Sequence, residues 1–167
     1  MTDEAIRALA DEAAISRAVA RYASVVDWQD WDQLPRIFTA DAHFDFGGMF
    51  QGGLAEYTPF VAALEGGYDR RMHLMGVPRI DVDGDRARAE AASVIHCRIK
   101  GDDAHNDMVF WGRYLFDARR EGDGWKLTRL RYLLGAVHAS QQAPMDESMI
   151  NVADGCDPAH AEAPPPL

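Results

Sequence analysis

The chain of 167 residues has few clustered basic residues and no long apolar run. Its formal net charge is −10, and Lys and Arg gather in nothing larger than pairs such as Arg119-Arg120. A polyanion would bind against that field, so we expect neither nucleic acid nor an acidic membrane as partner. No stretch approaches the roughly 18 consecutive apolar residues of a membrane-spanning helix. The first residues lack a basic segment followed by an apolar one, so we expect no signal peptide and a cytoplasmic protein.

Cysteine is scarce too. Cys97 lies in an apolar segment and Cys156 in a polar one, and we expect both to be free thiols in a reducing compartment. Asp41, His43 and Asp45 alternate on one predicted strand, but no further ligand is spaced to complete a metal site. The sequence also lacks a glycine-rich phosphate loop, a dinucleotide fingerprint and a nucleophile elbow. We therefore predict a protein that uses no cofactor.

The periodicity of the apolar residues predicts an α+β fold. Helical spacing predicts helices over 3–30, 32–38 and 56–65, and polar–apolar alternation predicts strands over 42–46, 72–80, 86–100, 108–119 and 125–137. Helices followed by long antiparallel strands favour helices packed on one curved sheet. Residues 1–138 form the predicted domain. Residues 139–167, with their scattered prolines, are predicted to be an extended tail.

Several short segments resemble a known family. They are Tyr22-Ala-Ser-Val-Val-Asp27, Trp31-Asp-Gln-Leu, Phe38-Thr-Ala-Asp41-Ala and Asp123-Gly-Trp125-Lys-Leu. In this order they resemble the SnoaL-like branch of the nuclear-transport-factor-like superfamily over about residues 10–138. The resemblance implies a cone-shaped, curved, mostly antiparallel sheet packed on N-terminal helices, with a pocket at its open end. Because the superfamily holds enzymes, binding modules and assembly domains, these segments specify the fold more than the function.

Within that branch the chain is most similar to a lyase group: scytalone dehydratase, bile-acid 7α-dehydratase and hexachlorocyclohexane dehydrochlorinase. The resemblance places Asp27 and His73 at the group's aspartate on the first helix and histidine on the strand after the third helix. Tyr22 matches a tyrosine of the bile-acid enzyme, and His96 resembles the second pocket histidine of scytalone dehydratase. The chain departs from the dehydrochlorinase in lacking its lysine near the first helix. In place of the bile-acid enzyme's second aspartate it has His96.

These residues suit proton transfer. A neutral imidazole can take a proton from carbon when a carboxylate on its other ring nitrogen fixes the tautomer and stabilises the imidazolium. We predict His73 as this base and Asp27 as its partner. Tyr22 would donate a hydrogen bond to a substrate oxygen, and His96 would polarise a carbonyl or protonate a leaving hydroxyl. Structural interpretations stay open for all four: a hydrogen-bonded core histidine, a helix-terminating aspartate, a core tyrosine, and a histidine whose strand face is ambiguous.

Four further residues are predicted to bind substrate. Trp111, Met72 and Met108 would form apolar walls of the pocket or fill the core. Arg129, which shares a strand face with Arg131, would balance a departing anion, although the sequence leaves open whether that face points inward.

The predicted function is a cofactor-independent lyase, a dehydratase or dehydrohalogenase, acting on a small hydrophobic cyclic molecule. Three alternatives stay open. They are an isomerase that uses the same proton shuttle, a non-catalytic ligand-binding module, and the small subunit of a ring-hydroxylating oxygenase. The resemblance also implies a homo-oligomer, a trimer or dimer. The predicted tail would lie over a pocket or a neighbouring subunit.

Overall fold

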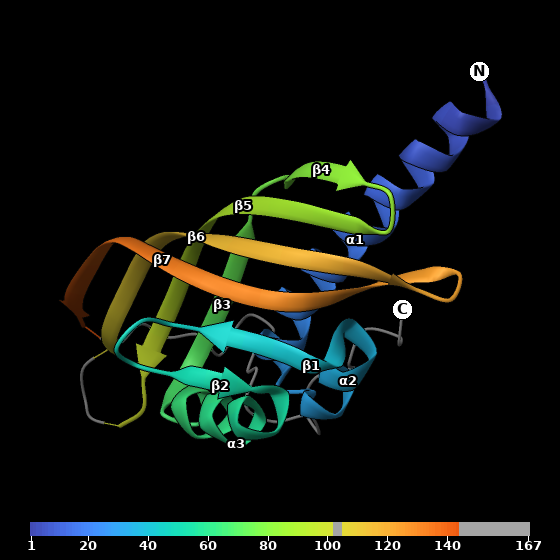
Figure 1. Cartoon of the computed structure of the whole chain (residues 1–167). Helices are drawn as coiled ribbons and strands as arrows, with labels where there is room; N and C mark the ends of the chain where they lie inside the picture. The colour runs from blue at the N-terminus through green and yellow to red at the C-terminus, as the bar shows by residue number, and fades with distance from the viewer. Residues whose placement is uncertain (102–104, 144–167) are drawn as a thin grey trace.

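The structure is a computed structural model that describes residues 1–101 and 105–143 (Figure 1). The chain begins with the helices α1 (Asp3–Trp28), η1 (a 3₁₀ helix, Trp31–Gln33) and α2 (Leu34–Ile37). Helix α3 (Leu54–Glu65) comes later, between strands. The strands are β1 (Phe38–Asp45), β2 (Gln51–Gly53), β3 (Tyr68–Met75), β4 (Arg79–Asp83), β5 (Arg86–Ile99), β6 (His105–Glu121) and β7 (Gly124–Gln142).

The strands form one curved, open sheet in the order β2-β1-β7-β6-β5-β3, with β4 also paired to β5. Among the described residues the strands pair antiparallel, except that β1 and β7 pair parallel. Helix α1 runs behind the sheet, and α3 lies beneath its lower end (Figure 1). This confirms the predicted α+β architecture, in which helices pack on a mostly antiparallel curved sheet.

The sheet has two faces of different character, because successive strand residues point to opposite sides. Along β5 every second residue is buried: Ala87, Ala89, Ala91, Ser93, Ile95 and Cys97. We call this side, which α1 covers, the inner face. The residues between them, from Arg86 to Arg98, point to the outer face, where most are exposed or half-buried.

Helix α1 supplies much of the core on the inner face. Thr2 caps its start by accepting a hydrogen bond from the Ala5 backbone N–H, and Ile15, Val19 and Val26 are each almost fully buried. At roughly 1.5–3 kcal/mol for each fully buried aliphatic side chain, this stripe fixes the helix to the sheet. Its first turns project past the sheet (Figure 1). In the described part of the chain, no helix combines the length and apolarity that crossing a membrane requires.

Several predicted boundaries differ from the structure, and two of the differences are large. The strand predicted over 72–80 is two strands, β3 and β4, separated by residues 76–78. Pro78 has no backbone N–H to donate to a ladder, which explains the break. Strand β7 continues to Gln142, into the predicted tail, because its end pairs with the start of β6. The rest of that tail, from residue 144, lies outside the described residues.

Candidate active site

Asp27 and His73 are in direct contact. The Asp27 Oδ1 atom lies 2.7 Å from His73 Nδ1. The same carboxylate accepts hydrogen bonds from the His73 backbone N–H, at 3.1 Å to Oδ1 and 3.0 Å to Oδ2. One carboxylate therefore holds both the ring and the backbone of His73, which fixes the imidazole in position and orientation. We call Asp27 and His73 the dyad.

The position of Asp27 is unfavourable for the helix that carries it. Asp27 is the penultimate residue of α1, where the helix dipole disfavours negative charge, and the last turn of α1 carries no basic side chain. The compensation comes from β3, which is the edge strand of the sheet next to β5. An edge strand has backbone N–H groups that no neighbouring strand accepts, and Asp27 accepts the one of His73.

The contact also determines the tautomer. An ionised carboxylate only accepts hydrogen bonds, so in the neutral ring Nδ1 must carry the proton that it donates to Asp27. The lone pair then lies on Nε2, at the far side of the ring. The His73 side chain is 4% exposed and that of Asp27 is 21% exposed, so the ring is shielded from bulk water. This arrangement prepares Nε2 to accept a proton.

The inner face around His73 is mostly apolar. Across the sheet His73 is level with Ile95 and Phe110, and the next inner position of β3, Met75, is level with Ser93. In the opposite direction along the strands, Met108 pairs with Cys97 on the same face as the dyad. Met108 is one of the predicted substrate residues. Met108 is thus the predicted pocket residue that shares a face with His73.

A buried ion pair that the sequence did not suggest lies next to the dyad. Arg71, the inner-face residue two positions before His73, donates from Nε to Glu65 Oε2 at 2.9 Å. Glu65 is the last residue of α3, and both side chains are at most 7% exposed. Burial raises the pKa of the Glu65 carboxyl, while the charges of His73 and Arg71 lower it. This pair places a second carboxylate within electrostatic reach of the imidazole.

Tyr22 lies in the core, and its hydroxyl already has a partner. The Tyr22 and Tyr57 hydroxyl oxygens are 2.7 Å apart, and both residues are at most 2% exposed. Burial raises the pKa of each of these phenols well above the usual value. Tyr57 was not predicted as a buried partner of Tyr22, although its spacing of four positions from the buried Val61 on α3 places both on the same helix face.

His96 and Met72 lie on the outer face, so the prediction that they stand beside His73 is wrong in its geometry. They are cross-strand partners of one another, and each is adjacent in its strand to an inner-face residue. The His96 ring contacts Asp107, with 3.4 Å between Nε2 and Oδ2, and Arg98 also binds this carboxylate. Met72 is 57% exposed. The sheet itself separates both side chains from the dyad.

Trp111 and Arg129 are likewise on the outer face. Trp111 pairs with Val94 across the strands and is 43% exposed. The Arg129 side chain lies opposite Asp117 on β6 and is 3.8 Å from the carboxylate of Asp45. The predicted roles of these residues at the dyad's pocket do not fit their positions within one chain.

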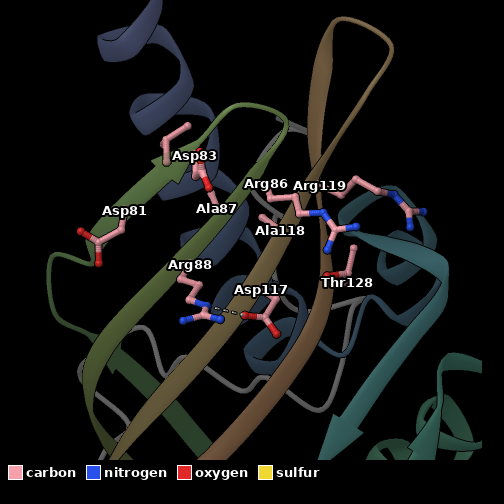
Figure 2. A pocket seen from close by; sticks show the side chains of 10 residues that line it. Asp81, Asp83, Arg86, Ala87, Arg88, Asp117, Ala118, Arg119 and Thr128 are labelled. Atoms are coloured by element: carbon pink, nitrogen blue, oxygen red, sulfur yellow. Dashed lines mark ion pairs between the residues drawn. The ribbon is translucent and has the colours of Figure 1, made fainter.

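The outer face carries a charged groove of about 570 Å³, which Figure 2 shows from close by. Arg88 lies 3.8 Å from Asp117, and Arg86 and Arg119 extend toward the same side of the groove (Figure 2). Positive and negative side chains balance in its lining, so it is not suited to binding a simple anion. In residues 1–101 and 105–143, no three His, Cys, Asp or Glu side chains are grouped to hold a metal ion.

The comparison with protein families identifies the domain. A family model described as the SnoaL-like domain matches residues 7–131, which is most of the chain. The chain belongs to the SnoaL-like domain family. An uncharacterised protein of Mycobacterium tuberculosis, Rv2910c, is 27% identical to it over 124 residues, which cover 72% of this chain and 83% of the relative.

Solved structures of this SnoaL-like fold superpose well on the chain. A protein of Novosphingobium aromaticivorans provisionally assigned as an aromatic ring hydroxylase has a TM-score of 0.70 at 27% identity, over 80% of this chain and 94% of that one. One provisionally assigned as a scytalone dehydratase, from the same species, has a TM-score of 0.70 at 18% identity, over 83% and 95%. The LinA-type3 hexachlorocyclohexane dehydrochlorinase of Novosphingobium barchaimii has a TM-score of 0.73 at 16% identity, over 81% and 93%. At these low identities the last two show the fold alone.

Proposed function

We propose that the protein is a cofactor-independent lyase in which His73 is the general base and Asp27 is its orienting partner. The observation that carries the proposal is that the Asp27 carboxylate contacts both the ring and the backbone N–H of His73 by hydrogen bonds. A structural hydrogen bond needs only one of these contacts. Together they fix the direction of Nε2, as a proton transfer from carbon requires.

The proposed reaction is an elimination. Nε2 of His73 takes a proton from a carbon beside a carbonyl, and the electrons of that C–H bond form a carbon–carbon double bond. The leaving group on the next carbon departs with its bonding electrons. A departing hydroxide takes the proton from the imidazolium and leaves as water, whereas a halide leaves as an anion and the proton passes to solvent. With no leaving group, return of the proton to another carbon gives the isomerase alternative.

The proposed substrate is a small hydrophobic cyclic molecule. Support comes from the partly buried apolar side chains that pack against the core, among them Phe46, Phe60, Met75 and Phe110. Apolar walls with a few directed polar groups are typical of small-molecule sites. The solved structures similar to this chain also include one provisionally assigned as a scytalone dehydratase and a hexachlorocyclohexane dehydrochlorinase.

One alternative has an observation in its favour. The similar structure provisionally assigned as an aromatic ring hydroxylase is 27% identical to the chain. If this protein were the small subunit of a ring-hydroxylating oxygenase, it would form a stable complex with a large iron-bearing subunit, and the isolated chain would turn over no substrate. Turnover by the isolated chain excludes this alternative.

The proposal is tested with a panel of hydroxylated and halogenated cyclic ketones. The purified full-length chain is expected to convert at least one of them, with loss of water or halide detected by mass spectrometry. His73→Ala should lower the rate roughly 10²- to 10⁴-fold, the usual worth of a positioned general base. Asp27→Asn should lower it at least about tenfold, because the amide fails to stabilise the imidazolium.

The matched control is His138→Ala, which removes an exposed histidine of β7 beyond the dyad's surroundings. It should turn over substrate like the wild-type protein. A His73→Ala variant that is folded and as fast as this control would refute His73 as the base.

A further inference from the structure

Glu65 and Arg71 place a fixed pair of opposite charges beside the dyad. Arg71 Nε donates to the Glu65 carboxylate at 2.9 Å, and Arg71 Nη2 donates to the backbone carbonyls of Glu65 and Tyr68 at 2.6 and 2.8 Å. The guanidinium therefore holds the end of α3 against the start of β3. Neither side chain can swing out to water without breaking these contacts.

The pair stands close enough to His73 to act on it. Arg71 and His73 are alternate residues of β3 on the same face, which places their Cα atoms roughly 6.5 Å apart. The charge of His73 is the strongest of the charge effects that lower the pKa of the Glu65 carboxyl. A Coulomb interaction is mutual, so a charge on Glu65 also acts on the imidazole.

Two further titratable groups near the dyad, among the residues that the structure describes, are neutral near pH 7. Burial raises the pKa of the Cys97 thiol on β5 to about 12. Burial likewise raises the pKa of Tyr114 on β6 well above its usual value. Within residues 1–101 and 105–143, the charges that face His73 are then Asp27 from α1, Glu65 from α3 and Arg71 from β3. With a neutral imidazole they sum to −1, and protonation of His73 brings the cluster to neutrality.

We propose that Glu65 is a positioning residue of the active site, which stabilises the protonated state of His73 through space while Arg71 holds its carboxylate in place. This inference rests on the proposed function, in which His73 receives the substrate proton. Asp27 acts by direct contact and Glu65 by charge alone. The second carboxylate increases the proton affinity of Nε2, and Arg71 limits that increase.

The test is an NMR titration of the histidine ring carbons in the full chain, which requires no substrate. In Glu65→Gln the midpoint for His73 should move to lower pH by half a unit to one unit, roughly a three- to tenfold loss of proton affinity. In Arg71→Gln it should move to higher pH. Glu65→Asp should restore most of the wild-type midpoint. His96, on the outer face, is the internal reference and should titrate identically in all four proteins.

The opposite signs separate this role from a structural one. If Glu65 and Arg71 only held α3 to β3, either variant would loosen the same contact, and the His73 midpoint would move the same way in both. That result, or an unmoved midpoint, overturns the proposal. Because the readout is a titration, it is independent of whether a substrate has been found, and failure of the lyase proposal is seen separately as absent turnover.

A measurement on the wild-type protein covers the case in which a variant does not fold. The ¹³C signal of the Glu65 carboxyl should show a second inflection at the pH at which His73 titrates, since coupled groups report each other's protonation. A Glu65 signal that passes through the His73 midpoint without a shift would contradict the coupling directly.

Discussion

At the scale of single residues, the chain accepts a stability cost at its candidate site. Asp27 lies where the α1 dipole opposes it, and Glu65 is a carboxylate withdrawn from water. Residues placed against local preference are typical of functional sites. Their partners, the edge-strand N–H of His73 and the guanidinium of Arg71, come from β3. Hydrogen-bond donors from the same short strand therefore offset the free-energy cost of both carboxylates.

The tyrosine pair of the core gives a prediction at this scale. Tyr22→Phe leaves the Tyr57 hydroxyl buried without its partner and should lower the free energy of unfolding by roughly 1–3 kcal/mol. The double variant Tyr22→Phe, Tyr57→Phe removes both polar groups and should recover part of that loss. Urea unfolding followed by circular dichroism measures both. A double variant that loses the sum of the two single losses would show that the hydroxyls do not act as a pair.

The sequence identified the dyad but not the face of the other candidates. Asp27 and His73 followed from the family resemblance, and their contact is now seen at 2.7 Å. His96 and Trp111 were misplaced because apolar residues occupy both faces at this end of the sheet, so Val94 and Ile95 are adjacent although they point in opposite directions. Alternation reveals a strand's orientation only where one face is polar. Glu65 and Arg71 were missed because each is an ordinary charged residue until the fold brings them together.

At the scale of elements, α1 is clamped to the β6–β7 hairpin by a polar cluster. Asp11 of α1 accepts hydrogen bonds from Arg120 at 2.8 and 2.7 Å and from the Trp125 ring N–H at 2.9 Å. The guanidinium of Arg120 also lies over the Trp125 ring, 4.6 Å from its centroid. The hydrogen bonds from Arg120 lower the pKa of Asp11 to about 2. The clamp joins segments more than a hundred positions apart in the sequence.

This clamp predicts an acid-dependent stability. Because the pKa of Asp11 is lowered on folding, its carboxylate stabilises the fold above about pH 4 and loses this effect as the pH falls toward 2. Asp11→Asn should lower the free energy of unfolding by roughly 1 kcal/mol at pH 7 and by almost nothing at pH 2. Asp85→Asn is the matched control, because its exposed carboxylate also binds Arg120 yet should have little effect. A deficit of Asp11→Asn that stays constant down to pH 2 would contradict the account.

Element types were predicted better than their ends. The long helix of 3–30 and the strand of 86–100 are present as α1 and β5 within two residues at each end. The early start of β1, at Phe38, was not predicted, because Phe38 continues the apolar pattern of the helix before it. Phe38 belongs to the sheet because it pairs with Leu127 of β7. Such long-range pairing leaves no local signal in the sequence.

At the scale of the whole molecule, the outer face carries an exposed apolar surface. Leu74, Trp111 and Leu133 are 60%, 43% and 38% exposed, and they line a shallow hollow of about 850 Å³. Contiguous apolar surface of this kind marks an interaction site. We propose that a second copy of the chain covers it.

Sedimentation velocity tests this proposal. The wild-type protein should sediment as an oligomer at micromolar concentration, and Trp111→Glu should dissociate it to a monomer, because the new charge would be buried without a partner. Leu9→Glu, at an equally exposed apolar position of α1, is the control and should leave the assembly intact. A wild-type monomer, or a Trp111→Glu variant with an unchanged sedimentation coefficient, would contradict self-association through this face.

The central claim, that Nε2 of His73 removes a proton from carbon, is tested most directly by hydrogen–deuterium exchange at the substrate carbon. Cyclic ketones without a leaving group are incubated with the protein in D₂O, and deuterium uptake beside the carbonyl is followed by NMR. The account predicts catalysed exchange by the wild-type protein and a rate at least about 10²-fold lower for His73→Ala, since exchange needs the base alone. Equal exchange by the two folded proteins would contradict it.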